Sequence, residues 1–166
     1  MTKAVVLVGH GSVASDVPRP LVRRLRTLEA ERRTNGAAMS PEELELDHRV
    51  RGWPRTPETD PYQAGMDAIA ERLRARVGRV VVAYNEFCAP SLEEAVAALV
   101  GEGVREVTVV TTMMTPGGVH SEIEIPESVQ ALRGAHPGLR IRYAWPFDLE
   151  AVAGLLAQAC ETASGA

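Results

Sequence analysis

Short runs of apolar residues alternate along the chain with segments whose apolar residues recur every three or four positions. Three of these runs are rich in β-branched residues and lie at 5–8, 80–84 and 107–111. A continuous run of this kind is typical of a strand that is buried on both faces of a sheet. Residues 139–144 instead alternate polar and apolar side chains, which indicates a half-exposed edge strand. The pattern therefore predicts four strands.

Five segments between and after these strands have helical periodicity. Their apolar stripes lie at 21–28, 66–73, 92–99, 126–133 and 149–156. Pro18 and Pro20 are placed to begin the first helix, Ser91 to cap the third and Gly134 to end the fourth. Strands that alternate with helices are joined by right-handed crossovers. We therefore expect an α/β fold, with a four-stranded parallel sheet and helices on both of its faces.

The segment at about 33–62 departs from this pattern. It contains Asn35-Gly36, several prolines and many charged residues, and its apolar residues show little periodicity. A structureless loop of this length is uncommon inside a compact domain. We therefore expect a single domain over residues 1–166, in which this segment is either a functional flap or a surface insertion.

Composition and charge exclude several classes of function. The formal net charge of −4 disfavours a nucleic-acid partner, although residues 1–83 carry +3 and residues 84–166 carry −7. Lys3 is the only lysine, which excludes both a P-loop and Schiff-base chemistry. The apolar run that follows Lys3 ends too early for a signal peptide or a membrane span. Two cysteines do not suggest a disulfide framework, so we expect a cytoplasmic protein without a membrane partner.

Potential metal ligands follow three of the predicted strands. His10 comes after the first strand, Glu86 after the second, and His120 in the longer loop after the third. Ligands of an open parallel sheet bind beyond the carboxyl ends of its strands, so these side chains are expected to meet. Two imidazoles and a carboxylate suit Fe²⁺, Co²⁺, Ni²⁺ or Zn²⁺. A set of only three protein ligands leaves one coordination position open for chemistry.

Residues beside these three ligands are candidates for substrate contacts: Gly11, Ser12, Met113, Gly117, Gly118 and Glu124. Gly117-Gly118 is suited to a hinge that allows the backbone to approach a ligand closely. Ser121 and Glu124 match the capping-box pattern, but Pro126 disfavours a helix that runs straight through that box. Glu124 therefore either caps a helix or points into the site as a proton acceptor.

Three blocks of the sequence resemble the CbiX-type sirohydrochlorin chelatases, in their short single-lobe form. The blocks are Val6–Ser12, Ala83–Ala95 and Gly117–Pro126, each placed at the end of a predicted strand. The likeness covers residues 4–16 and about 79–148. Val13 stands where members of the family often have arginine, and Glu124 replaces the usual aspartate.

The resemblance implies a flavodoxin-like, chelatase-like lobe and a lyase-type reaction in cobalamin or siroheme biosynthesis. In that reaction Co²⁺, Fe²⁺ or Ni²⁺, itself a substrate, is inserted into sirohydrochlorin or a related tetrapyrrole without ATP or an organic cofactor. The resemblance also implies that His10 and His120 bind the metal and take up pyrrole protons, with Glu86 as a further ligand. Because short members of the family pair, it implies a homodimer.

Arginines of the more basic first half have two interpretations. Arg19, Arg49, Arg51 and Arg55 either bind the carboxylates of a tetrapyrrole or form an ordinary solvated surface.

Two other functions use parts of the same pattern. A non-catalytic carrier or sensor of metal or tetrapyrrole needs the same three ligands. The spacing Gly9-x-Gly11-x-x-Ala14 after a strand also matches a dinucleotide-binding fingerprint. In that fingerprint an acidic residue follows within roughly 20 residues, whereas Glu86 lies much farther along the chain.

Overall fold

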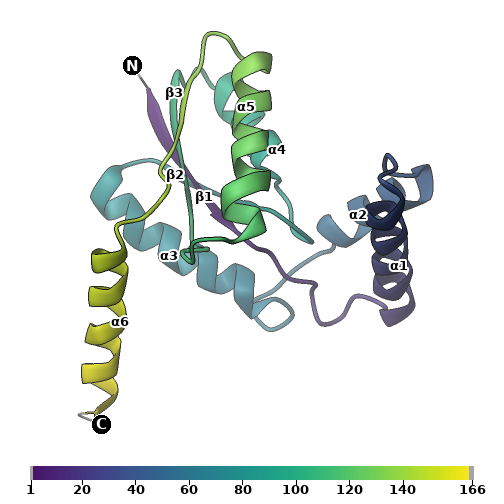
Figure 1. The fold of residues 1–166 in the computed structure, drawn as a ribbon, viewed down its shortest axis with the longest axis horizontal. Coiled ribbons are helices and arrows are strands. Elements are labelled where there is room, and N and C mark those ends of the chain that lie inside the picture. Colours follow the sequence, from purple (N-terminus) through teal and green to yellow (C-terminus); the bar gives the residue numbers. More distant parts are fainter. Residues whose placement is uncertain (1, 165–166) are drawn as a thin grey trace.

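The computed structural model describes residues 2–164 and has the predicted α/β architecture (Figure 1). Its strands are β1 (Lys3–Gly9), β2 (Val80–Tyr84), β3 (Glu106–Thr111) and β4 (Arg140–Tyr143). Its helices are α1 (Arg19–Asn35), α2 (Pro41–Arg51), α3 (Pro61–Val77), α4 (Leu92–Gly101), α5 (Ile125–Ala135) and α6 (Leu149–Ser164), and a π-helical turn, η1 (His120–Glu124), leads into α5. The strands form one parallel sheet in the order β2-β1-β3-β4, so the predicted sheet is confirmed.

Apolar layers cover both faces of this sheet. Val6 of β1 is in register with Val81 of β2 and Val109 of β3. Val6 and Val109 are fully buried in a cluster that includes side chains of α4 and α5. On the opposite face, Leu7 packs in a cluster with Met66 of α3. Full burial of such an aliphatic side chain stabilises the fold by about 1.5–3 kcal/mol, which explains why the β-branched runs at 5–8 and 107–111 form the two central strands, β1 and β3.

The fourth strand lies at the edge of the sheet. β4 pairs with β3, and its exposed Arg140 and Arg142 flank the buried Ile141. This alternation confirms the half-exposed edge strand that the sequence predicts.

The segment at about 33–62 is not a structureless loop, because α1 continues to Asn35, α2 forms from Pro41 to Arg51, and α3 begins at Pro61. Gly36 ends α1 in the left-handed conformation, with φ of 60°. Ser40 caps α2 by accepting a hydrogen bond from the Glu43 N–H at 3.1 Å. Val50 is the one buried apolar residue of α2, while Glu43 is buried through its ion pair with Arg32 of α1. A cap and charge pairs thus support a helix that lacks an apolar stripe.

Helices α1 and α2 form an arm (residues 19–51) that stands beside the sheet rather than on it (Figure 1). The arm has a small core of its own, in which Leu25 and Val50 pack with Ala14 and Val17 from the chain after β1. The chain that leaves the central strand therefore connects the arm directly to the sheet.

The last helix, α6, extends away from the sheet (Figure 1). Its predicted apolar stripe is not buried within the chain, since Leu149, Leu155 and Leu156 are 59%, 54% and 58% exposed. Within residues 2–164, no helix combines the length and the apolar character needed to cross a membrane.

Candidate metal centre

The fold brings His10, Glu86 and His120 together at the carboxyl end of the sheet. One ligand atom from each of the three side chains lies within 4.8 Å of the other two. The rings of His10 and His120 meet edge to face, with centroids 4.9 Å apart, and His10 Nε2 lies 3.7 Å from Glu86 Oε2. The strand order explains this meeting, because β1 lies between β2 and β3. All three side chains are partly exposed, so the cluster is accessible to a metal and to a larger ligand.

Two hydrogen bonds orient His10. Its backbone N–H donates to the Tyr62 hydroxyl at 2.8 Å, and its Nδ1 lies 2.8 Å from the Gly11 carbonyl oxygen. Because a carbonyl only accepts, the proton of the neutral ring sits on Nδ1. The Nε2 lone pair of His10 is then left for a metal or a proton.

His120 is oriented by a carboxylate. Its Nδ1 lies 2.7 Å from Glu124 Oε2, which also accepts a hydrogen bond from Asn85 Nδ2 at 2.6 Å. Burial opposes ionisation of Glu124, but the hydrogen bonds from His120 and Asn85 outweigh it and hold the pKa of this carboxyl below its ordinary value. An ionised Glu124 keeps the ring proton on Nδ1, so His120 also presents Nε2. A carboxylate behind a histidine in this way is typical of metal-binding histidines.

The local helix geometry selects between the two roles predicted for Glu124. The capping box does not form, since the Ser121 hydroxyl donates to the Gly118 carbonyl at 3.3 Å and Glu124 contacts His120. The chain instead passes through a wide turn, in which the Ile125 N–H bonds the His120 carbonyl. Pro126 falls in the first turn of α5, where its missing N–H leaves no bond unmade.

Replacement of Glu124 by alanine is expected to weaken metal binding by roughly 10–100-fold, the range found when the partner behind a metal-binding histidine is lost. The variant frees the Nδ1 proton of His120 and removes the acceptor of Asn85. Calorimetric titration with Co²⁺ measures the affinity. Glu127→Ala, an exposed change of the same charge on α5, is the control, and equal affinities for the two variants would contradict this role.

Gly11 is required where the first two ligand loops touch. Its φ is +98°, and a Cβ at this position would lie 1.8 Å from the Glu86 carbonyl oxygen. This close approach allows the Glu86 N–H to donate to the His10 carbonyl at 2.8 Å. The absence of a side chain at Gly11 thus joins the loops of His10 and Glu86.

The other predicted substrate contacts make bonds or packing contacts within the protein. The Ser12 hydroxyl donates to Asp60 at 2.6 Å, and Met113 packs against the larger core cluster. Gly117 has φ of +82° and its N–H donates to Glu122 at 2.9 Å, while Gly118 lies close to the Ser121 hydroxyl. Their contact with a substrate stays a prediction.

A buried ion pair joins the segment at about 33–62 to the ligand loops. Arg55 and Asp60 form the pair, and their side chains are 5% and 0% exposed. Arg55 also donates to the carbonyl oxygens of Ser12 at 2.9 Å and Phe87 at 2.5 Å. Burial tends to raise the pKa of Asp60, but hydrogen bonds from Ser12, the Gln63 N–H and Arg55 outweigh it and lower that pKa.

Two of the four arginines singled out in the sequence, Arg51 and Arg55, therefore use their guanidinium groups for bonds within the protein. Arg51 pairs with Asp47 and donates to the carbonyl oxygens of Asn85 and Cys88, each at 3.1 Å. Together with Arg55, it holds the loop after β2 from outside the sheet. Arg19 and Arg49 remain exposed. Sequence reasoning also missed Asn85 and Tyr62, whose partners lie far away in the chain.

The sequence model of the CbiX family matches residues 58–163. A protein from Marinobacter aquaeolei VT8, described as a CbiX protein of cobalamin (vitamin B12) biosynthesis, has a similar structure, with a TM-score of 0.59 and 19% identity over 99% of this chain and 100% of that one. At this identity the likeness shows the fold. Among curated proteins no sequence matches.

Two structures of SirB are also similar. SirB from Bacillus subtilis with Fe³⁺ has a TM-score of 0.48 and 19% identity, over 92% of this chain and 44% of that one. The sirohydrochlorin chelatase SirB from Bacillus subtilis subspecies spizizenii, in complex with cobalt, has a TM-score of 0.49 and 18% identity, over 97% of this chain and 51% of that one. This chain thus spans about half of each SirB chain.

Proposed function

Because this chain belongs to the CbiX family, we propose that it is an ATP-independent chelatase that inserts Co²⁺, Fe²⁺ or Ni²⁺ into sirohydrochlorin or a related tetrapyrrole. The observation that carries the proposal is the group of His10, Glu86 and His120, with ligand atoms within 4.8 Å at the carboxyl end of the sheet. Three protein ligands leave the metal free to exchange into another molecule, whereas a closed structural site would hold it. The metal is a substrate in this reaction, and the proposal includes no organic cofactor.

The reaction requires that two protons leave the inner nitrogens of the macrocycle as the metal enters. Imidazole changes its charge near neutral pH and serves as ligand or as base. With Nδ1 of each ring engaged, His10 and His120 both keep Nε2 without a proton, so either can accept a proton once the metal has departed. The ionised Glu124 holds the His120 ring in place, while Glu86 offsets the charge of the incoming cation.

Anaerobic incubation with metal-free sirohydrochlorin and each metal in turn tests the proposal. The absorbance change of metallation is expected to proceed through many turnovers per protein molecule, at a rate above that of the same mixture without protein. Stoichiometric binding without turnover would instead favour a carrier or sensor. The dinucleotide alternative gains no support from the geometry, because Gly11 approaches the Glu86 carbonyl and leaves no space there for a pyrophosphate.

We further propose that the chain is a single chelatase domain and that two copies pair. Support for pairing comes from α6, which carries three leucines that are more than half exposed: Leu149, Leu155 and Leu156. Contiguous apolar surface of this kind marks an interaction site. Light scattering is expected to give the mass of a dimer, and Leu155→Glu with Leu156→Glu is expected to give that of a monomer. A monomeric wild-type protein would contradict the pairing.

A further inference from the structure

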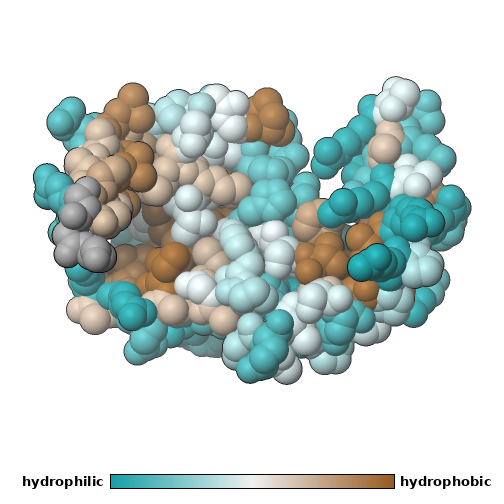
Figure 2. Space-filling view, turned by 90° about the horizontal axis from the view of Figure 1, so that it is seen from below, coloured by the Kyte–Doolittle hydropathy of each residue, from teal (hydrophilic) through white to brown (hydrophobic). Residues whose placement is uncertain are grey.

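A cavity of about 780 Å³ lies between the chain that follows β1 and the adjacent side of α1. This volume is within the range of small-molecule sites. Its wall includes Val13, Val17 and Val22, which belong to or pack against the small core of the arm. In Figure 2 a notch separates the arm from the rest of the molecule, and hydrophobic residues lie beside hydrophilic ones at its base. The cavity therefore offers an apolar surface to a ligand.

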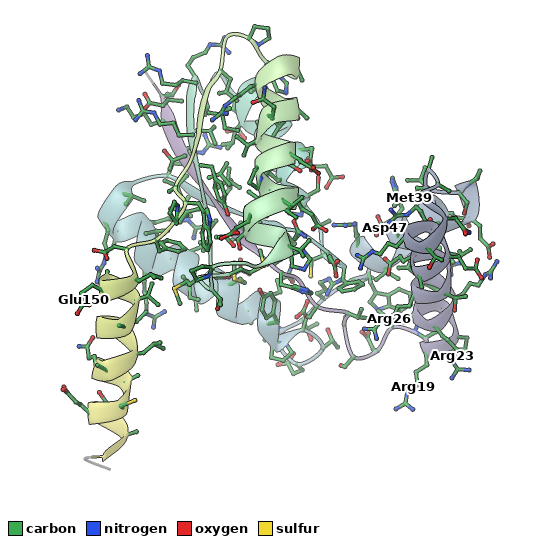
Figure 3. All side chains as sticks on the ribbon, in the orientation of Figure 1. Arg19, Arg23, Arg26, Met39, Asp47 and Glu150 are labelled. Atoms are coloured by element: carbon green, nitrogen blue, oxygen red, sulfur yellow. The ribbon has the colours of Figure 1, made fainter. Side chains whose placement is uncertain are left out.

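Three arginines of α1 line the same cavity. Arg19, Arg23 and Arg26 follow one another at intervals of four and three residues, which places them on one side of the helix. Figure 3 labels them along the lower half of α1, with Arg26 nearest to the sheet-bearing part. Within residues 2–164, none of these guanidinium groups forms an ion pair. Glu31 is the single acidic residue of the lining, so the cavity is positively charged.

Other arginines of α1 behave differently. Arg24 binds Glu42 of α2 through two hydrogen bonds of 2.7 and 2.5 Å, and Arg32 binds Glu43 at 2.8 Å. The helix thus uses these arginines to hold the arm together. Among residues 2–164, the arginines at the cavity have no carboxylate partner of this kind, so their three guanidinium groups are available to an anion.

The arginine-lined side of α1 leads to the candidate metal ligands. The guanidinium carbon of Arg26 lies 5.9 Å from the centroid of the Phe87 ring, and that centroid lies 6.2 Å from the centroid of the His10 ring. Phe87 has φ of 59°, a left-handed conformation that is unusual for a bulky residue, and Arg55 holds its carbonyl. Farther along α1, the Nη2 atom of Arg33 lies 3.4 Å from Oε1 of Glu86. One molecule of moderate size can therefore touch both the arginines and the metal ligands.

We propose that Arg19, Arg23 and Arg26 bind carboxylate groups at the edge of a tetrapyrrole while the valines of the cavity contact its ring. The proposal rests on the chelatase function above and names the protein surface that selects an anionic macrocycle. Guanidinium groups bind carboxylates through paired hydrogen bonds, and the apolar wall suits a flat ring. Phe87 then separates the carboxylate-binding arginines from the reacting centre at His10. The arm thereby acquires a role in substrate recognition.

Titration of metal-free sirohydrochlorin into the protein, followed by fluorescence and without any metal, tests this surface. The double variant Arg23→Gln with Arg26→Gln is expected to raise the dissociation constant roughly tenfold or more, since hydrogen bonds to charged groups are strong. The control removes the same two charges from α3 through Arg72→Gln with Arg76→Gln, which lie outside the cavity. The control variant is expected to bind as the wild type does.

The outcomes separate this proposal from the chelatase function. If the arginine variant binds sirohydrochlorin more weakly and the control variant does not, the result supports the proposed carboxylate-binding surface. This holds even if the wild type binds without turnover and the chelatase function fails. If the arginine variant binds sirohydrochlorin with the affinity of the wild type, the proposed carboxylate-binding surface is wrong. This holds even if the wild type, the arginine variant and the control variant all insert metal. Equal weakening in the control also overturns it, because the effect is then one of net charge. Circular dichroism checks that α1 stays helical in both variants.

Discussion

Replacement of His10 or His120 by alanine is expected to abolish metal insertion while the protein stays folded. Each histidine supplies one of three candidate ligands and one of two candidate bases, so its removal affects both metal binding and proton transfer. The loss is expected to exceed the roughly 10–100-fold that follows loss of a group behind a metal ligand. Both side chains are partly exposed and neither belongs to a core cluster, so their truncation leaves no large cavity.

Initial rates of sirohydrochlorin metallation and thermal unfolding are the two measurements for these variants. His48→Ala is the matched control, because His48 is exposed on α2 and lies outside the metal-ligand cluster. Insertion at the wild-type rate in either His10→Ala or His120→Ala would exclude that histidine from the reaction. Glu86→Ala is expected to have a smaller effect on the rate and to raise the metal concentration needed for half-maximal insertion.

The meeting of the three candidate ligands is predictable from sequence, because in a parallel sheet it depends only on which residues directly follow each strand. Once residues 5–8, 80–84 and 107–111 are assigned to strands of one parallel sheet, their carboxyl ends share an edge. His10, Glu86 and His120 follow those ends and therefore meet there. The fold enters the prediction only through strand direction and order.

The groups that orient the ligands depend on tertiary contacts that no local pattern contains. Tyr62, the second residue of α3, accepts a hydrogen bond from the His10 backbone N–H, and Asn85 donates to Glu124 of the η1 turn. One signal was available, because His120 and Glu124 are four residues apart and share a face if the segment is helical. Pro126 disfavours a regular α-helix through this segment, but the π-helical turn places His120 and Glu124 together before the proline.

The segment at about 33–62 shows a different limit. An apolar stripe is the usual signal of a helix, and α2 has only Val50 buried as an apolar residue. Its stability comes from the Ser40 cap and from pairs such as Arg32 with Glu43, whose partners belong to another element. The spacing of apolar residues does not reveal ion pairs between two helices, so the sequence of α2 resembles that of a polar loop.

Replacement of Asp60 by asparagine is expected to lower the free energy of unfolding by about 3–5 kcal/mol at neutral pH, because it leaves the buried Arg55 guanidinium without its counter-charge. Asp60 also caps α3, accepting from the Gln63 N–H at 3.0 Å, and accepts from Ser12. Total stabilities of such domains are only about 5–15 kcal/mol. Urea unfolding of the wild type, Asp60→Asn and the exposed control Asp67→Asn measures the difference.

The pH dependence of that difference identifies its origin. The pKa of Asp60 is lowered in the folded protein, so its ionised form adds stability above the ordinary aspartate pKa of about 3.9. That contribution is lost as the pH falls below this value and then through the lower pKa of the folded state. The gap between wild type and Asp60→Asn is therefore expected to narrow on acidification, while Asp67→Asn follows the wild type throughout. A difference in unfolding free energy that stays constant between neutral pH and pH of about 3 would show that the asparagine acts through packing. It would also show that the charge pair does not hold the segment at about 33–62 to the metal-ligand loops.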